Sequence, residues 1–357
     1  MRRFDSIVAH DPSPRPLTAK KRGSAGTLYP KVGMIKTPLC DRLGIEFPIV
    51  LGGMGSGTTP ELVSAVSEAG GLGTLGMNAR AAEDAAPLMA KVRQGTGKPF
   101  GVNFLLFNLD EAAFAATLAE RPPVVAFAWA KPEQNLREYF QRAHDAGALV
   151  MYQTGSVPEA RLALEAGAEV LIAQGAEGGG HVGLMGTLPL VPMMVDAVSP
   201  APVLAAGGIA DGRGLVAALA LGAQGVLLGT RFLATPEAPL HENFKAAILA
   251  SDGHNTELTN IPDIGRGQLW PGAMARVIRN RFIRRWSGQD SALRAAQAEI
   301  TRSLAEARKS GDVEEGLLMA GQDAGLIHDI VPAGEIVRRI AGEAEKVLSG
   351  LSGMGPG

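Results

Sequence analysis

The sequence has little that would support a disulfide-bonded, membrane-spanning or metal-cluster protein. Its single cysteine, Cys40, excludes an internal disulfide and a cluster of thiolate ligands, and it fits a reducing cytoplasm. No apolar run approaches the roughly 20 residues that cross a bilayer. The six histidines are scattered and no carboxylate cluster accompanies them, so we expect no metal site. The net charge of −2 gives no reason to expect nucleic acid or an anionic membrane as a partner.

Glycine is abundant, with 46 residues, whereas aromatic residues make up only 5% of the chain. Many tight turns between strands and helices, and an interior of small side chains, would account for both values. The hydrophobic fraction of 46% is that of a globular protein with a sizeable core. A length of 357 residues allows two domains, but α/β barrels also reach this size as one domain.

Residues 1–34 differ in composition from the rest of the chain. Basic clusters at Met1-Arg2-Arg3 and Lys20-Lys21-Arg22 alternate with prolines, and no apolar segment follows the arginines as in a secretory signal. Acidic residues in the segment disfavour a transit peptide. We predict a mobile tail whose deletion leaves folding and activity nearly unchanged, with Met34 as a candidate start of the chain.

From Phe47 onward, short apolar runs alternate with amphipathic, alanine-rich segments. The apolar runs are continuous, as in a parallel sheet that is covered on both faces. This alternation predicts a (β/α)8 TIM barrel. An open doubly wound sheet is the alternative, but glycine clusters follow several strands rather than the first alone. The predicted strands are Pro48–Leu51, Leu72–Leu75, Phe100–Asn103, Val124–Ala128, Leu149–Gln153, Val170–Ala173, Val203–Ala206 and Gly225–Leu228.

The segments between the strands read as helices, and several of them end in glycine, the expected residue just past a helix. The predicted helices are Pro60–Ala69, Ala82–Arg93, Gln134–Ala146, Pro158–Ala166 and Gly214–Leu221, and the glycines are Gly70, Gly147, Gly167 and Gly222.

After Phe232 the alternation ends. We predict a smaller helical subdomain at 236–325, inserted after the eighth strand, and a barrel made of 35–235 and 326–350 that a helix near Ile336–Leu348 closes. The basic stretch from Arg276 to Arg285 is interpreted as a solvated helix face.

A glycine-dense run from Ala173 to Gly183 follows the sixth predicted strand and carries His181. Its five glycines let the backbone approach a ligand, since no Cβ stands in the way. A titratable imidazole in such a place suits proton transfer beside a bound planar cofactor. The simpler interpretation is a loop histidine without a role.

Two further glycine motifs, Ala205–Gly212 and Gly229–Phe232, follow the seventh and eighth predicted strands. In barrels these loops often bind phosphate through backbone N–H groups, although glycine there also simply tightens a turn. Gly52–Gly57 follows the first strand without the spacing of a dinucleotide fingerprint, and we interpret it as flat backbone beside a ring. Predicted strand ends also place three amides on one face, where they suit the pyrimidine edge of a flavin or act as strand caps: Asn103, Gln153 and Gln174.

Taken together, these motifs resemble the nitronate monooxygenase family (older name 2-nitropropane dioxygenase) over about residues 36–345. The related flavin-dependent enoyl-ACP reductases share the Gly-Gly-His motif and both phosphate loops. The motifs that carry the resemblance are Gly52-Gly53-Met54, Ala69–Gly73, Phe100–Asn103, Ala173–Gly183, Ala206–Gly212 and Gly229–Phe232.

The resemblance implies an FMN-containing barrel that oxidises alkyl nitronates with O2, and it makes His181 the catalytic base. Family-like quinone reductases are expected to carry a lysine where this chain has Gln153, which lowers the quinone interpretation. The FMN contacts that the resemblance implies are Gly53, Met54, Asn103, Gln153, Gln174, Gly179, Gly207, Gly208, Gly229, Thr230 and Gln322.

Our leading hypothesis is therefore a cytoplasmic, FMN-dependent flavoprotein monooxygenase whose partners are a small-molecule substrate and O2. The first alternative is an NAD(P)H-dependent flavin reductase that acts on an enoyl thioester or a quinone. The second is a non-redox barrel that binds a phosphorylated metabolite. The sequence is compatible with a homo-oligomer and leaves its size, like the physiological substrate, open.

Overall fold

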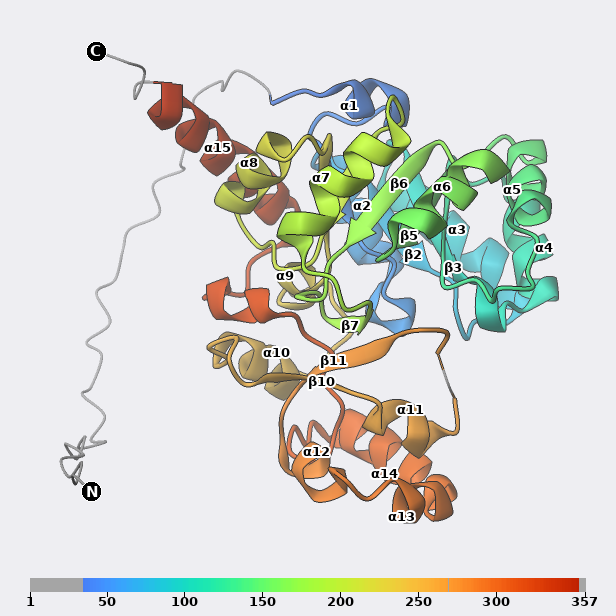
Figure 1. Cartoon of the computed structure of the whole chain (residues 1–357), viewed down its shortest axis with the longest axis vertical. Helices are drawn as coiled ribbons and strands as arrows, with labels where there is room; N and C mark the ends of the chain where they lie inside the picture. Colours follow the sequence, from blue (N-terminus) through green and yellow to red (C-terminus); the bar gives the residue numbers. More distant parts are fainter. Residues whose placement is uncertain (1–34, 269, 353–357) are drawn as a thin grey trace, which may run out of the picture. The chain divides into compact units, whose positions relative to one another are not determined.

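The computed structural model describes residues 35–268 and 270–352, so the predicted tail at 1–34 lies outside the described residues. Within them, one sheet of eight parallel strands has the order β1-β9-β8-β6-β5-β4-β3-β2 (Figure 1). A parallel bridge between Val50 and Leu72 joins its two ends, and the predicted barrel is confirmed. The strands are β1 (Ile49–Leu51), β2 (Gly73–Gly76), β3 (Phe100–Leu105), β4 (Val124–Ala128), β5 (Leu149–Thr154), β6 (Val170–Gln174), β8 (Val203–Ala206) and β9 (Gly225–Leu228).

Most connections between barrel strands are helices, which cover the outer face of the sheet (Figure 1). The helices outside the 236–325 segment are α1 (Pro38–Leu43), α2 (Pro60–Glu68), α3 (Ala85–Gly95), α4 (Glu111–Ala119), α5 (Leu136–Asp145), α6 (Val157–Ala166), α7 (Thr187–Val198), α8 (Gly212–Ala220), α9 (Thr230–Leu233) and α15 (Ala333–Ser352). Short 3-10 helices are η1 (Gly55–Gly57), η2 (Ala82–Asp84), η3 (Leu106–Asn108) and η4 (Gln322–Leu326).

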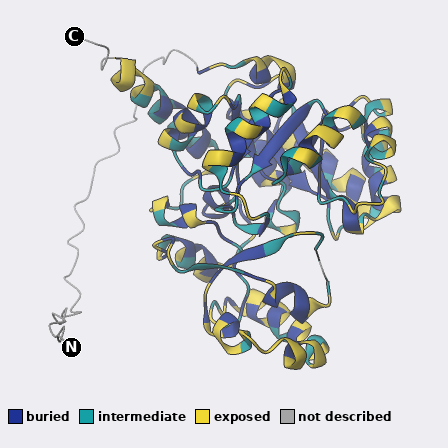
Figure 2. Ribbon diagram, in the orientation of Figure 1, coloured by how far each residue is buried: buried dark blue, intermediate teal, exposed yellow. Residues whose placement is uncertain are grey.

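Side chains alternate between two apolar layers along each strand. In β6, Ile172 belongs to a cluster inside the barrel, whereas Leu171 packs outward with the helices. The inner cluster also contains Leu39 and Cys40 of α1, so this helix closes one end of the barrel with apolar side chains. Figure 2 shows the consequence: the strands are buried, and the helices are exposed only on their outer faces.

The local signals that predicted the helices have a clear structural basis. Thr59 and Ser156 accept hydrogen bonds from the first turns of α2 and α6, as N-cap residues do. The glycines that were predicted to end helices all have left-handed backbone, a conformation that glycine adopts without strain. They are Gly70, Gly147, Gly167 and Gly222.

The 236–325 segment contains strands as well as helices, which the sequence did not predict. β10 (Thr256–Thr259) and β11 (Met274–Ile278) pair antiparallel, and β11 pairs with β7 (Gly180–Val182), the strand that carries His181. The division of the chain at residues 235 and 325 stays a prediction. The helices of the segment are α10 (Glu242–Leu249), α11 (Ile261–Arg266), α12 (Arg281–Trp286), α13 (Asp290–Ala295) and α14 (Gln297–Ser310).

The basic stretch divides into two environments. In α12 the arginines are largely exposed and pair with Glu314 and Glu315, as expected of a solvated face. Arg276, by contrast, is buried in β11, so the solvated-face interpretation is wrong for this residue. None of the helices in the described residues has the length and apolar character that a membrane crossing requires.

Candidate active site

The predicted site residues follow the C-terminal ends of the barrel strands, the end at which α/β barrels carry their active sites. Parallel pairing brings these ends to one edge, with Gln174 of β6 opposite Ala206 of β8 and Ala206 opposite Leu227 of β9. The loop from Gly175 to Gly179 leaves this edge and leads into β7. We call this edge and its loops the barrel mouth.

His181 lies in β7, opposite Ala275 of β11. Its Nε2 is 2.8 Å from Oδ1 of Asp263 in α11, and each side chain is 6% exposed. A barrel loop thus supplies the imidazole, and a helix of the 236–325 segment supplies the carboxylate. The sequence alone did not indicate this pair, because 82 residues separate its members.

An aromatic cluster covers one face of the His181 ring. The indole of Trp270 stacks on it with ring centroids 3.5 Å apart and an interplanar angle of 8°. Phe107 and Trp129 contact the same indole, at centroid distances of 4.6 and 6.0 Å. Trp129 follows β4 with φ 57°, a conformation that is strained for a bulky side chain and often marks functional sites.

The loop before β7 is held by polar contacts on both sides. The Glu177 carboxylate accepts hydrogen bonds from the backbone N–H and the hydroxyl of Thr187. Arg276 donates from Nε to the carbonyl oxygen of Ala176 at 2.7 Å and from Nη1 to Thr256. Burial lowers the pKa of Arg276, and the charge of Glu177 opposes that shift. These contacts fix the loop that places His181.

The first predicted phosphate loop packs against this His181 loop, and the second begins at the end of the neighbouring strand β9. Gly207 and Gly208 have φ values of 96° and 72°, and Gly207 packs so tightly that a Cβ would lie 2.8 Å from the Gly175 carbonyl oxygen. Within the described residues, the backbone N–H groups of Gly207, Gly208, Gly229 and Thr230 donate no hydrogen bond. Such unpaired donors at the ends of adjacent strands suit an anionic ligand such as a phosphate.

The 3-10 helix η4 joins the same cluster. The backbone N–H of Gly321 donates to the Thr230 hydroxyl at 2.9 Å, and that of Gln322 donates to the Glu177 carbonyl oxygen. Gly179 packs against Gly321 so closely that no Cβ would fit. The neighbouring carboxyl of Asp323 is buried, and burial raises its pKa to about 7, although the Thr230 hydroxyl lowers it in part.

Not all three predicted amides come together. Gln153 donates from Nε2 to Oε1 of Gln174 at 3.0 Å, whereas Asn103 donates to the Ala126 carbonyl oxygen at 3.3 Å. Gly53 packs directly against the Asn103 side chain. Met54 lies beside Gly229, since a Cβ on that glycine would be 3.5 Å from the Met54 sulfur.

Sequence reasoning missed Asp263, Trp270 and Asp323. Asp263 and Trp270 belong to a segment without barrel periodicity, and only the scarcity of tryptophan could have drawn attention to Trp270. Asp323 is next to the predicted Gln322, but burial, which makes it unusual, is not visible in the sequence. No group of three or more His, Cys, Asp or Glu residues in the described part of the chain is placed to hold a metal ion.

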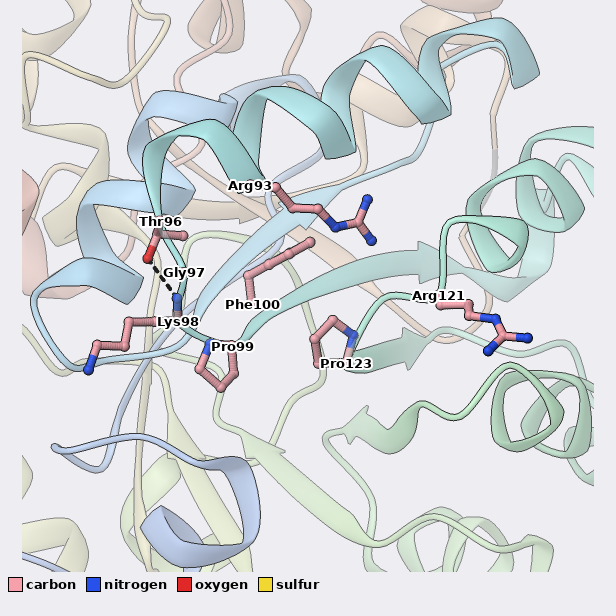
Figure 3. A pocket seen from close by; sticks show the side chains of 8 residues that line it. All are labelled: Arg93, Thr96, Gly97, Lys98, Pro99, Phe100, Arg121 and Pro123. Atoms are coloured by element: carbon pink, nitrogen blue, oxygen red, sulfur yellow. Dashed lines mark hydrogen bonds between the residues drawn. The ribbon is translucent and has the colours of Figure 1, made fainter.

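A separate cavity of about 430 Å³ lies at the start of β3, lined by residues that include Arg93, Lys98 and Arg121 (Figure 3). Phe100 opens β3, so this cavity is at the opposite end of the strand from Asn103 and contains none of the predicted site residues. Its three cationic side chains point in different directions rather than toward a common point. We therefore place the candidate active site at the barrel mouth.

Known proteins share this architecture. The family described as nitronate monooxygenase matches residues 36–121 and 110–343. The chain is 34% identical to (3aS,4S,5R,7aS)-5-hydroxy-7a-methyl-1-oxo-octahydro-1H-indene-4-carboxyl-CoA dehydrogenase of Mycobacterium tuberculosis, over 87% of this chain and 96% of that protein. It is similar to the solved structure of FabK from Thermotoga maritima, with a TM-score of 0.80, 38% identity, and coverage of 89% and 99% of the two chains. Nitroalkane oxidase from Streptomyces ansochromogenes gives a TM-score of 0.76, 31% identity, and coverage of 88% and 99%. The chain therefore belongs to the nitronate monooxygenase family of oxidoreductases.

Proposed function

We propose that this protein uses FMN to oxidise alkyl nitronates, the anions of nitroalkanes, with O2, and that His181 is its base. One observation carries the proposal. The His181 imidazole is buried in β7, directly after the loop that packs against Gly207 and Gly208, where backbone N–H groups have no partner within the described residues. A single short loop thus leads from the unpaired backbone donors to a titratable side chain.

The residues at the barrel mouth fit a flat cofactor with one terminal phosphate. The unpaired N–H groups suit the phosphate, and the paired amides of Gln153 and Gln174 can donate to and accept from a pyrimidine edge. When bound, FMN would accept electrons from the substrate and pass them to O2. We propose that the residues holding it are Gly53, Met54, Asn103, Gln153, Gln174, Gly179, Gly207, Gly208, Gly229, Thr230 and Gln322.

His181 has two tasks in this proposal. With a neutral nitroalkane, the imidazole accepts the proton from the carbon next to the nitro group. With a nitronate that has already lost this proton, the protonated ring, which carries an N–H on both nitrogens, orients the anion by donating a hydrogen bond. Asp263 and Trp270 hold the ring in place for both tasks.

Cofactor analysis tests the first half of the proposal. Purified protein should be yellow, and heat should release FMN rather than FAD, because the phosphate loops suit one terminal phosphate. Chromatography of the released flavin identifies it. FAD, or a colourless protein from cells grown with riboflavin, would contradict the proposal and favour a non-redox barrel.

Substitution of His181 tests the second half. His181→Asn should retain FMN but lose about 10²- to 10⁴-fold in turnover of neutral nitroalkanes, the usual cost of a lost general base. Turnover of pre-formed nitronates should fall less, because no proton has to be removed from them. His144→Asn is the matched control, since His144 also pairs with a carboxylate but precedes β5, at the far end of the barrel. Equal, small effects on both substrate forms would remove His181 from the role of base.

The second candidate function is NAD(P)H-dependent flavin chemistry on a thioester. It is favoured by the Mycobacterium tuberculosis relative, whose name describes a carboxyl-CoA dehydrogenase, and by the aromatic surface of Phe107, Trp129 and Trp270. Anaerobic mixing with NADH or with propionate 3-nitronate separates the two candidates. Rapid bleaching of FMN by NADH alone would support the second, and bleaching by the nitronate alone would support the first.

A further inference from the structure

We infer that Asp263 positions the His181 ring, so that Nδ1 is the nitrogen that exchanges a proton with the substrate. The inference deepens the proposed function and rests on it for the role of His181. Asp263 is a positioning residue in this account, because it acts through the imidazole. The inference rests on the contact between His181 of β7, the strand after the barrel-mouth loop, and Asp263 of α11 in the 236–325 segment.

Hydrogen-bond chemistry assigns the two ring nitrogens. An ionised carboxylate can only accept, so the 2.8 Å contact to Asp263 requires a proton on Nε2 of His181. A neutral imidazole has one N–H, and Nδ1 is then left as the acceptor. No group in the described residues hydrogen bonds to Nδ1 of His181, and this nitrogen is not among the fully buried unpartnered atoms, so it is available to a substrate.

The charge of Asp263 has support from its own helix. The residue lies in the first turn of α11. The charge of Arg266, one turn along the same helix, also interacts favourably with it, and Arg308 adds a second positive charge near Arg266. A carboxylate at Asp263 is therefore stabilised by a neighbouring positive charge.

Independent contacts fix both partners. The Asp263 carbonyl oxygen accepts from the backbone N–H of Gln268 at 2.9 Å, and Gln297 of α14 donates to the next carbonyl oxygen, that of Ile264. The His181 backbone is paired with β11, and Trp270 covers one face of its ring. With both backbones held, the carboxylate can set the rotation and the tautomer of the imidazole.

The experiment uses the full-length protein with bound FMN and ¹⁵N-labelled histidine. Correlation spectra report which ring nitrogen carries the proton, and comparison with His181→Asn assigns the His181 signal among the six histidines. We expect the neutral ring to carry its proton on Nε2. In Asp263→Asn this preference should be lost, and turnover of neutral nitroalkanes should fall about 10- to 10³-fold with FMN content unchanged.

Asp263→Glu and Glu169→Gln complete the design. The glutamate variant keeps a carboxylate and should retain the Nε2–H tautomer, and it replaces Asp263→Asn if that variant fails to fold. Glu169 accepts from Nε2 of His144 at 3.1 Å, away from the barrel mouth, so Glu169→Gln should leave the His181 signal and turnover unchanged. It controls for loss of any histidine–carboxylate pair.

Two outcomes would overturn the inference: a proton on Nδ1 of neutral His181 in the unaltered protein, or an Asp263→Asn spectrum and turnover like those of the unaltered protein. Failure of the proposed function looks different. In that case His181→Asn keeps its turnover of nitroalkanes, while the tautomer measurement still decides whether Asp263 sets the ring.

Discussion

At the scale of single residues, the barrel mouth is packed so closely that one added carbon matters. Gly53 faces the Asn103 side chain, and a Cβ at position 53 would overlap the Asn103 Cβ, an atom that cannot swing away without its backbone. Asn103 in turn lies within β3, held by neighbouring strands on both sides. A methyl group at this position must therefore displace the strand or the loop.

Gly53→Ala should lower the free energy of unfolding by about 1–3 kcal/mol, the usual cost of overpacking, and should weaken retention of FMN. Gly97→Ala is the matched control, because a Cβ there meets nothing within 4 Å and its φ is not left-handed. Urea unfolding of both variants, with the flavin content of each, checks the prediction. Equal midpoints for the two variants would contradict it.

Asp323 makes a prediction about pH. Burial raises its folded pKa to about 7, whereas an unfolded aspartate has a pKa near 3.9. Between these values the folded state holds a proton that the unfolded state has released, so stability should fall as pH rises from about 4 to 7 and then level off. From pH 5 to pH 8 the titration of Asp323 should lower the free energy of unfolding by about 2–3 kcal/mol.

Asp323→Asn removes that contribution because an amide does not titrate in this range. Urea midpoints of both proteins at pH 5 and pH 8 separate the Asp323 effect from that of the other titratable groups, which the two proteins share. The variant should lose less stability than the unaltered protein over this interval. Parallel losses in the two proteins would show that Asp323 does not carry the pH dependence.

At the scale of elements, β11 carries a buried arginine, whereas the arginines of α12 are exposed. Arg276 of β11 is 7% exposed and donates to Ala176, in the loop that leads to His181. Arg284 of α12 is 59% exposed and pairs with Glu314 at 3.3 Å. A buried charge-assisted hydrogen bond contributes far more than an exposed ion pair.

Arg276→Ala should therefore lower the free energy of unfolding by about 2–4 kcal/mol and reduce activity, because it leaves the Ala176 carbonyl oxygen without its donor. Arg284→Ala should change it by less than about 1 kcal/mol. Denaturant unfolding and nitronate turnover of the two variants check this contrast. A reversed order would show that the His181 loop is held by other contacts.

The elements also show how far the sequence could predict the structure. The barrel strands were predictable because each is a continuous apolar run; Val124–Ala128 and Val203–Ala206 were predicted with the boundaries that the structure has. The small sheet was not predictable. β7 contains Gly180 and His181, and its partner β11 lies more than 90 residues later, so neither local propensity nor periodicity could reveal the pairing.

The same distinction holds for the candidate site. Parallel strands bring their C-terminal ends together, so the loops at Gly207 and Gly229 could be placed beside the His181 loop from the order of elements alone. Asp263 and Trp270 come from outside the barrel repeat, and the contact with His181 exists only after β11 has paired with β7. Long-range pairing, rather than any local motif, therefore completes the site.

At the scale of the whole molecule, α15 joins the two ends of the barrel sequence. It packs against α8 and against α2, the helix after β1 (Figure 1). Ile336, Val337 and Ile340 of α15 are buried in the main core. Their burial contributes about 1.5–3 kcal/mol each, a sum comparable with the total stability of a typical domain. The helix that closes the ring should therefore control the stability of the entire barrel.

Two substitutions in α15 should act in opposite directions. Ile340→Ala removes a side chain that is 2% exposed and should lower the free energy of unfolding by about 2–5 kcal/mol. Gly342→Ala, two residues later, adds a Cβ that meets nothing within 4 Å and should raise it by about 0.5–1 kcal/mol, since alanine loses less backbone entropy in a helix. Urea unfolding monitored by flavin fluorescence and by circular dichroism checks both. If α15 closes the barrel, both signals should shift together in each variant, whereas a shift in circular dichroism alone would mean that the helix unfolds independently of the site.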